Sequence, residues 1–182
     1  MSRIAIPASD HTPAASRPLL QAVHAQLGVV PNLMKVVGNS PAALDGYLAL
    51  NGALARGALD ARLRERIALA IAEFNGCEYC LAAHSYLGEK VAHLDAAEIG
   101  AARGGQSADR KAAAALQFAL QVAAAKGRVA DADLDAVRGA GFDDAGIVEI
   151  VTHVALNVLT NYVNNVARTD VDFPKVELRA AA

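Results

Sequence analysis

The chain has 182 residues, of which 54% are hydrophobic and 20% are charged, and its net charge is −2 at pH 7. This length suits one domain, and the balanced charge excludes the basic surface of a nucleic-acid-binding protein. No apolar stretch of signal-peptide length opens the chain and no basic cluster adjoins an apolar run, so we expect a cytoplasmic protein without a membrane role.

Helical signals occupy nearly every segment, and no segment shows the alternation of a strand. Residues 1–16 are polar and contain two prolines, which predicts an extended N-terminal arm. Ser40 followed by Pro41 is a favourable helix start, and Asp60 is a suitable cap for the next helix. The predicted helices of the first half cover residues 17–27, 32–38, about 41–56 and about 61–75.

The second half begins with Asn75-Gly76, a helix-stop signal, after which Cys77 opens another helix. Ser107 is the predicted cap of a long alanine-rich helix that ends at Gly127, and Asp143 is the predicted cap of the last helix. The predicted helices here cover residues about 77–91, 95–103, about 108–126, 131–139 and about 144–167, followed by an irregular tail over 171–182.

The last predicted helix is apolar over most of its circumference, so it must be buried on most sides. In a chain this small, that pattern predicts a subunit interface. Asn157, Asn161 and Asn164 share one side of this helix, and we interpret them as polar contacts between subunits rather than as the lining of a pocket. The predicted fold is therefore all-α: a single helical-bundle domain over residues 17–170 that forms a homo-oligomer.

The two cysteines, Cys77 and Cys80, lie three residues apart, and His84 follows four residues after the second. Positions four apart share a helix face, so the imidazole can accept the Cys80 proton or stabilise its thiolate. The start of a helix also favours an anion, and the spacing of the cysteines permits a disulfide after a small adjustment. This pattern predicts redox chemistry.

A base in contact with one thiol acts on that thiol alone, whereas the helix start acts on both. We therefore predict that Cys80 attacks the substrate and that Cys77 resolves the product. Glu65 lies on the preceding helix, and the break at residues 75–76 lets that helix fold back. A carboxylate there can orient His84 or pass a proton through water.

The pattern E-x11-C-x2-C-x3-H resembles the signature of the alkylhydroperoxidase D-like proteins, in the carboxymuconolactone decarboxylase family. The segments GVVPNLMKVVGNSPAALDGYLAL and LTNYVNNVARTDVDFP are similar to the peroxidase-related branch of that family, so the likeness covers most of the chain. Its relay residues match Glu65, Cys77, Cys80 and His84. In Tyr79 the chain departs from members that have a second histidine.

The resemblance implies an alkylhydroperoxidase D-like helical fold, assembled as a trimer or hexamer. It also implies a thiol-dependent peroxidase that reduces small alkyl or hydrogen peroxides. No bound cofactor is expected, and the electron donor is an external dithiol, either a lipoyl group or a thioredoxin-like protein. The family's true decarboxylases lack the paired cysteines, which disfavours decarboxylation.

The remaining candidates have structural alternatives. Tyr79 is interpreted as a pocket wall, and His153 as either a pocket residue or a satisfied core histidine. The cysteines can be inert buried thiols, or can bind zinc with His84 and one of His93 or His153. A lone pair of cysteines with one nearby histidine is a weak zinc signal because structural sites use four protein ligands, so no metal is predicted.

Glu65 can instead be a surface carboxylate that pairs with Arg62 or Arg64. At the level of function, two alternatives to the peroxidase stay open. One is a redox-responsive oligomeric interaction protein with little turnover. The other is a related small-molecule enzyme of the carboxymuconolactone decarboxylase family.

Overall fold

A computed structural model describes residues 2–8 and 11–179. Over these residues the chain contains nine α-helices, one short 3₁₀ turn and no strand, which confirms the predicted all-α class. The helices are α1 (Arg17–Leu27), α2 (Asn32–Val37), α3 (Pro41–Leu54), α4 (Ala61–Phe74), α5 (Glu78–Lys90), α6 (Ala96–Arg103), α7 (Arg110–Ala124), α8 (Asp131–Gly139) and α9 (Asp144–Ala167).

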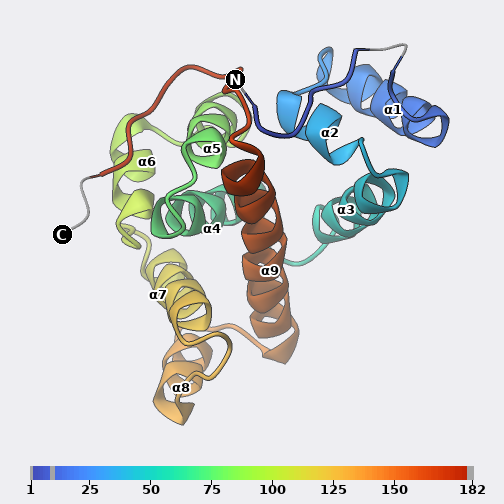
Figure 1. The fold of residues 1–182 in the computed structure, drawn as a ribbon. Helices are drawn as coiled ribbons and strands as arrows, with labels where there is room; N and C mark the ends of the chain where they lie inside the picture. Colours follow the sequence, from blue (N-terminus) through green and yellow to red (C-terminus); the bar gives the residue numbers. More distant parts are fainter. Residues whose placement is uncertain (1, 9–10, 180–182) are drawn as a thin grey trace.

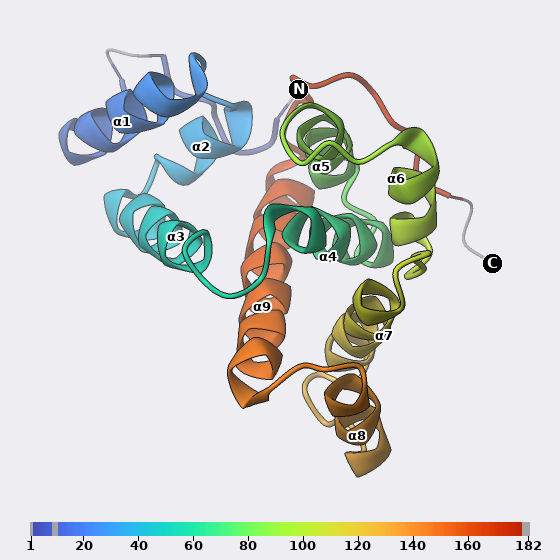
Figure 2. The ribbon, with the colours of Figure 1, turned by 180° about the vertical axis from the view of Figure 1, so that it is seen from behind.

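Helix α4 is the centre of the packing, since it contacts α5, α6, α7 and α9. Helix α9 lies between two groups of helices: α1–α3 are on one side and α4–α8 on the other (Figures 1 and 2). Contacts of α2 and α3 with α9 attach the first group to the rest of the fold. The site described below lies where α3, α4, α5 and α9 meet.

The sequence of α4 explains its central place. Asp60 caps it by accepting a hydrogen bond from the Leu63 amide at 2.8 Å, and its buried face includes Ile67 and Ile71, both with no exposed surface. The helix ends at Asn75, and Gly76 takes a left-handed conformation with φ of 60°. Glycine adopts that conformation without strain, so the chain can reverse and pack α5 against α4.

Helix α9 is long and apolar enough to cross a membrane by length and composition, the one such helix among the described residues. Half of its most apolar window is nevertheless buried inside the protein, as in the core helix of a folded domain. Six residues three or four positions apart remain exposed along its outer side. This α9 outer row consists of Val148, Val151, Ala155, Leu159, Tyr162 and Val166.

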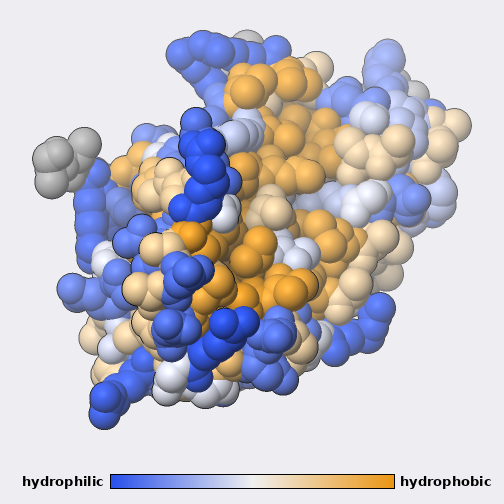
Figure 3. Space-filling view, turned by 90° about the horizontal axis from the view of Figure 1, so that it is seen from below, coloured by the Kyte–Doolittle hydropathy of each residue, from blue (hydrophilic) through white to orange (hydrophobic). Residues whose placement is uncertain are grey.

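The surface at one end of the molecule is also apolar. Figure 3 views the end at which α8 and the start of α9 lie, and shows hydrophobic residues across its centre with hydrophilic residues around them. An apolar area with a polar rim is typical of a surface that contacts another molecule.

Several predicted boundaries were wrong in detail. Residues 14–16, predicted as part of an extended arm, form a 3₁₀ turn that leads into α1. Helix α3 ends at Leu54 rather than near Arg56. Helix α7 is capped by Asp109 and not by Ser107: the Asp109 carboxylate accepts from two backbone amides, at 2.9 and 3.2 Å. An aspartate closer to the helix start outcompetes the serine because a carboxylate also interacts favourably with the helix dipole.

The described part of the C-terminal tail, residues 171–179, has no regular secondary structure but packs on the helices. Tyr79 of α5 donates a hydrogen bond to Asp172 at 2.8 Å, and its ring meets Phe173 edge to face, with centroids 5.8 Å apart. Near the other terminus, the amide of Arg3 donates to the carbonyl of Ala167 at 2.6 Å. The N-terminal segment and the start of the tail therefore lie beside the end of α9, whereas the tail continues to α6, where Arg179 donates to the carbonyl of Gly100 at 2.5 Å.

Candidate active site

The two cysteines lie at the start of α5, directly after the Asn75-Gly76 turn. Cys77 is the N-cap residue, and its Sγ accepts a hydrogen bond from the Cys80 backbone amide at 3.3 Å. Both thiols are free, and Cys77 and Cys80 are only 0% and 2% exposed. The sulfur of Cys77 therefore satisfies one of the unpaired amides of the helix start, and both thiols lie out of bulk solvent.

The environment separates the acidities of the two thiols. A hydrogen bond from Cys77 lowers the pKa of Cys80 to about 7 against the opposing effect of burial, and the nearby charge of His84 lowers it further. The same bond with Cys80, together with burial, raises the pKa of Cys77. Cys80 is therefore the thiol that loses its proton first as the pH rises.

Glu65 and His84 form the second part of the site. The Glu65 carboxylate lies 2.8 Å from Nδ1 of His84, joining α4 to α5, and both side chains are about a fifth to a quarter exposed. Burial disfavours the charged imidazole, but the charge and hydrogen bond of Glu65 outweigh it and raise the pKa of His84. A protonated His84 then favours the Cys80 thiolate, and Nε2 is the ring nitrogen left for proton transfer.

The arginines near Glu65 have other partners. Arg62 forms an ion pair with Glu98, and Arg64 donates to the carbonyl of Leu59 at 2.6 Å. Glu65 forms its hydrogen bond with His84. The alternative in which Glu65 pairs with one of these arginines was therefore wrong.

Helix α9 contributes amides to the same place. The side-chain nitrogen of Asn164 donates to Sγ of Cys80 at 3.2 Å, and Asn161 accepts a hydrogen bond from the side chain of Asn75 at 2.9 Å. Asn157, Asn161 and Asn164 are all buried within the chain. Their interpretation as contacts between subunits was therefore wrong: they face α4 and α5, because the apolar outer row occupies the exposed side of α9.

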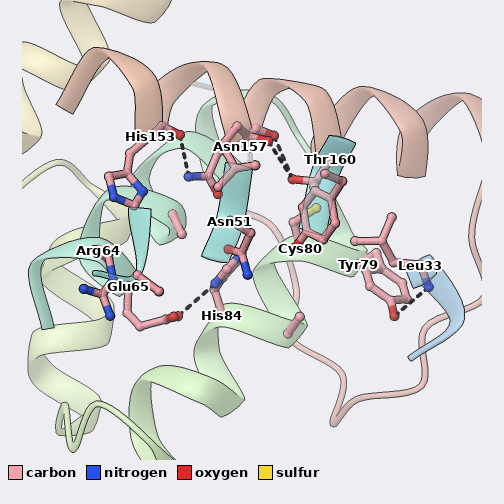
Figure 4. A pocket seen from close by; sticks show the side chains of 15 residues that line it. Leu33, Asn51, Arg64, Glu65, Tyr79, Cys80, His84, His153, Asn157 and Thr160 are labelled. Carbon is pink, nitrogen blue, oxygen red and sulfur yellow. Dashed lines mark hydrogen bonds and ion pairs between the residues drawn. The ribbon is translucent and has the colours of Figure 1, made fainter. Parts of the chain in front are cut away.

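A cavity of about 100 Å³ opens beside Cys80. It is lined by residues from α3, α4, α5 and α9, and Cys80 is on its wall whereas Cys77 is not. Figure 4 shows Cys80 and Tyr79 toward one end, Arg64 and His153 toward the other, and His84 between them. A small molecule in this cavity meets the thiolate and the imidazole together.

The two pocket candidates from the sequence both line this cavity. Tyr79 is held firmly, because its hydroxyl also accepts from the Leu33 amide at 3.1 Å, and burial raises its pKa. His153 is buried with Nε2 unpartnered, and burial and the charge of Arg64 lower its pKa. Tyr79 is thus a rigid wall, and His153 presents a neutral ring.

Sequence reasoning missed Tyr47 of α3, which also lines the cavity. Burial raises its pKa to about 12, and the negative charges of Cys80 and Glu65 add to the shift. No motif marks this tyrosine, since it lies far from the cysteines in the sequence. Only the packing of α3 beside α9 brings it to the site.

The zinc alternative depended on a third and a fourth ligand near the cysteines. Within the described ranges, no group of three or more histidine, cysteine, aspartate or glutamate residues is arranged to hold a metal ion. His93 is exposed beyond the end of α5, and His153 lies at the cavity end away from Cys80 (Figure 4).

Known proteins resemble the chain in sequence and in fold. Residues 41–125 match the carboxymuconolactone decarboxylase family. No curated protein matches the chain significantly. A peroxidase-related protein from Ralstonia eutropha JMP134, described as an alkylhydroperoxidase AhpD core, is 27% identical with a TM-score of 0.83, over 94% of this chain and 92% of that one.

Two further solved structures share the fold. A peroxidase-related protein from Silicibacter sp. TM1040 is 24% identical, with a TM-score of 0.81 over 93% of this chain and 91% of that one. The debrominase Bmp8, in complex with 2,3,4-tribromopyrrole, is 19% identical, with a TM-score of 0.77 and the same two coverages. The chain therefore carries a region of the carboxymuconolactone decarboxylase family over residues 41–125 and has the alkylhydroperoxidase D-like fold.

Proposed function

We propose that the protein is a thiol-dependent peroxidase that reduces small alkyl or hydrogen peroxides. One observation carries the proposal: Cys80, whose pKa is lowered to about 7, lines a small cavity beside a histidine that is paired with a carboxylate. A thiolate is the nucleophile that peroxide reduction requires, and the cavity admits a small substrate while excluding a large one.

In the first step the Cys80 thiolate attacks one peroxide oxygen. The sulfur–oxygen bond forms as the oxygen–oxygen bond breaks, so the sulfur is oxidised by two electrons to a sulfenic acid. The protonated His84 donates its proton to the departing oxygen, which leaves as an alcohol or as water. Glu65 holds the imidazole and supports its charged form before the step.

In the second step the Cys77 thiol attacks the sulfenic acid of Cys80. A disulfide forms, and the thiol proton leaves with the hydroxyl group as water. Cys77 suits the resolving role because its raised pKa keeps it protonated until Cys80 has reacted. Its position one turn before Cys80 requires only a small adjustment for bonding.

An external dithiol then reduces the disulfide through a mixed intermediate. The burial of both sulfurs favours a slender donor such as a lipoyl arm, which fits a narrow cavity better than the face of a thioredoxin-like protein. The protein itself needs no bound cofactor for this cycle. Because the cycle starts from reduced thiols, we place it in the cytoplasm.

Within the cavity, Tyr79 acts as the wall beside the reacting sulfur. His153 is the polar contact at the far end, where its unpartnered Nε2 can meet an oxygen of the organic part of a substrate. Because His153 lies toward the cavity end away from Cys80 (Figure 4), we assign this contact to the organic part of an alkyl peroxide rather than to hydrogen peroxide.

The test is peroxide consumption with dihydrolipoamide as the electron donor. Cys80→Ser should abolish turnover, whereas Ser85→Ala should retain it, since Ser85 lines a groove with α6 and the C-terminal tail. Cys77→Ser should consume about one equivalent of peroxide and then stop, because the sulfenic acid is not resolved. A Cys80→Ser protein with the full rate would refute the proposal.

A second candidate is a redox-responsive oligomer, and α9 favours it. The inner side of this helix contacts Cys80 through Asn164, while the outer side carries the exposed α9 outer row. Oxidation of Cys80 therefore acts directly on the helix that we propose as the interface between subunits of a homo-oligomer, a trimer or hexamer.

A further inference from the structure

The inner side of α9 has two features that the relay of Glu65, His84 and the cysteines does not use. The side-chain nitrogen of Asn161 and the side-chain oxygen of Asn164 are buried without a hydrogen-bond partner. Asn161 and Asn164 are themselves 0% and 3% exposed. Buried polar atoms are normally satisfied, so two unsatisfied atoms one helical turn apart indicate a bound group.

The placement of both amides relative to Cys80 identifies that group. Asn164 donates to Sγ of Cys80 at 3.2 Å. The hydrogen bond from Asn164, and next the nearby side-chain amide of Asn161, lower the pKa of the thiol. Asn161 is itself held by Asn75, the residue that ends α4 before the cysteine turn. A second bond, from Asn165 to the carbonyl of Asn75 at 3.0 Å, fixes the turn on α9.

We propose that Asn161 and Asn164 form a two-amide cradle that holds the negative charge of the Cys80 sulfur and then the oxygen that this sulfur receives. The second part of this proposal, the binding of the oxygen, rests on the proposed peroxidase function. The first part, the stabilisation of the Cys80 thiolate, does not. Asn164 touches the reacting sulfur and is a catalytic residue in that sense, whereas Asn161 completes the cradle from one turn away.

The chemistry of the product matches the unsatisfied atoms. A sulfenic acid has an oxygen that accepts a hydrogen bond and a proton that donates one. The free N–H of Asn161 can donate to that oxygen, and the free oxygen of Asn164 can accept that proton. The cradle is thus complementary to the oxidised sulfur in a place from which bulk water is excluded, where such bonds are strong.

Several other titratable groups surround Cys80 and contribute to the pKa of its thiol or to the charge near it. From α5 these are Cys77, Tyr79 and His84; from α3 it is Tyr47; and Glu65 of α4 acts through His84. None of these groups bonds to Asn161 or Asn164. Removal of an amide therefore changes the pKa of the Cys80 thiol but leaves the pair of Glu65 and His84 in place.

The experiment measures the rate of iodoacetamide alkylation of Cys80 between pH 5 and 10, in a Cys77→Ser background. Asn164→Leu should slow alkylation at pH 6 by about tenfold, because a hydrogen bond to a charged group is lost. Asn161→Leu should slow alkylation less, because Asn161 lies near the sulfur without bonding to it. The limiting rate at high pH should not change. Thr152→Ala, a change on α9 at a hydroxyl that bonds only within its own helix, should alkylate like the parent.

Asn164→Asp keeps the shape of the side chain and protects the test against misfolding. Its carboxylate repels a thiolate, so alkylation at pH 6 should fall at least as far as in Asn164→Leu. Circular dichroism and the melting temperature verify that each variant is folded. A folded Asn164→Leu or Asn164→Asp protein with the parent pH profile would overturn the cradle. Alkylation needs no peroxide, so this result is independent of whether the protein reduces peroxides.

Discussion

At the scale of single residues, the chemistry depends on one charge, that of Glu65. Its carboxylate raises the pKa of His84, and the charged imidazole in turn helps to lower the pKa of Cys80 to about 7. The pH window in which a Cys80 thiolate faces a protonated His84 therefore extends from the lowered pKa of the thiol to the raised pKa of the imidazole. Both limits of this pH window depend on Glu65.

Glu65→Gln should narrow that window from both sides. Without the carboxylate the pKa of His84 falls, which moves the alkaline limit down, and the pKa of Cys80 rises, which moves the acidic limit up. We expect kcat/KM at pH 7 to fall about tenfold, less than the loss of a general acid itself. The pH profile of peroxide reduction is the measurement, and Glu89→Gln, an exposed change on α5, is the control. A Glu65→Gln profile of unchanged width would contradict the relay.

At the scale of helices, α6 is joined to α4 by Glu98. This residue completes a capping box with Asp95 and forms ion pairs with Arg62 and the buried Arg66. The amide of Asp95, followed by the two arginines, lowers the pKa of Glu98 to about 2. A free glutamate titrates near 4.3, so the folded state gains stability from Glu98 above that pH and loses it as the pH falls toward 2.

Glu98→Gln should therefore lower the free energy of unfolding by about 1 kcal/mol at pH 7. The difference from the parent should shrink as the pH falls from about 4 to about 2, since the parent then also carries a neutral side chain. Urea unfolding at a series of pH values measures this. Asp135→Asn, on the exposed surface of α8, should show no such pH dependence. A constant difference down to pH 2.5 would exclude the electrostatic explanation.

The helices also show what the sequence can predict. The ranges of α1, α8 and α9 agreed with the structure. Pro18 and Gly28 mark the two ends of α1, and Asp143 caps the start of α9. Glu65, Cys77, Cys80 and His84 came from two neighbouring helices joined by a marked turn, so their meeting followed from local geometry. Tyr47 could not be found in this way, because it comes from α3 and its position depends on tertiary packing. For the same reason the sequence placed Asn161 and Asn164 on one side of α9 but did not show that this side faces Cys80.

At the scale of the whole molecule, the α9 outer row is the strongest reason to expect a homo-oligomer. Its members recur every three or four residues, the spacing with which helices pack against one another in coiled coils. Val148, Tyr162 and Val166 are each more than half exposed. Water contact of so many apolar groups along one helix is unfavourable, and a second copy of the chain can cover them.

Tyr162→Lys, or Leu159→Lys together with Tyr162→Lys, should dissociate the oligomer at micromolar concentration, because a lysine buried in an apolar interface has no partner for its charge. Size-exclusion chromatography with light scattering measures the mass. Val91→Lys introduces the same charge at a residue that is 63% exposed beyond α5 and should leave the mass unchanged. The parent protein is also run with and without reductant. A mass that changes with reductant favours the redox-responsive oligomer, because oxidation of Cys80 acts on α9 through Asn164. A Tyr162→Lys protein with the parent mass would exclude α9 as the interface.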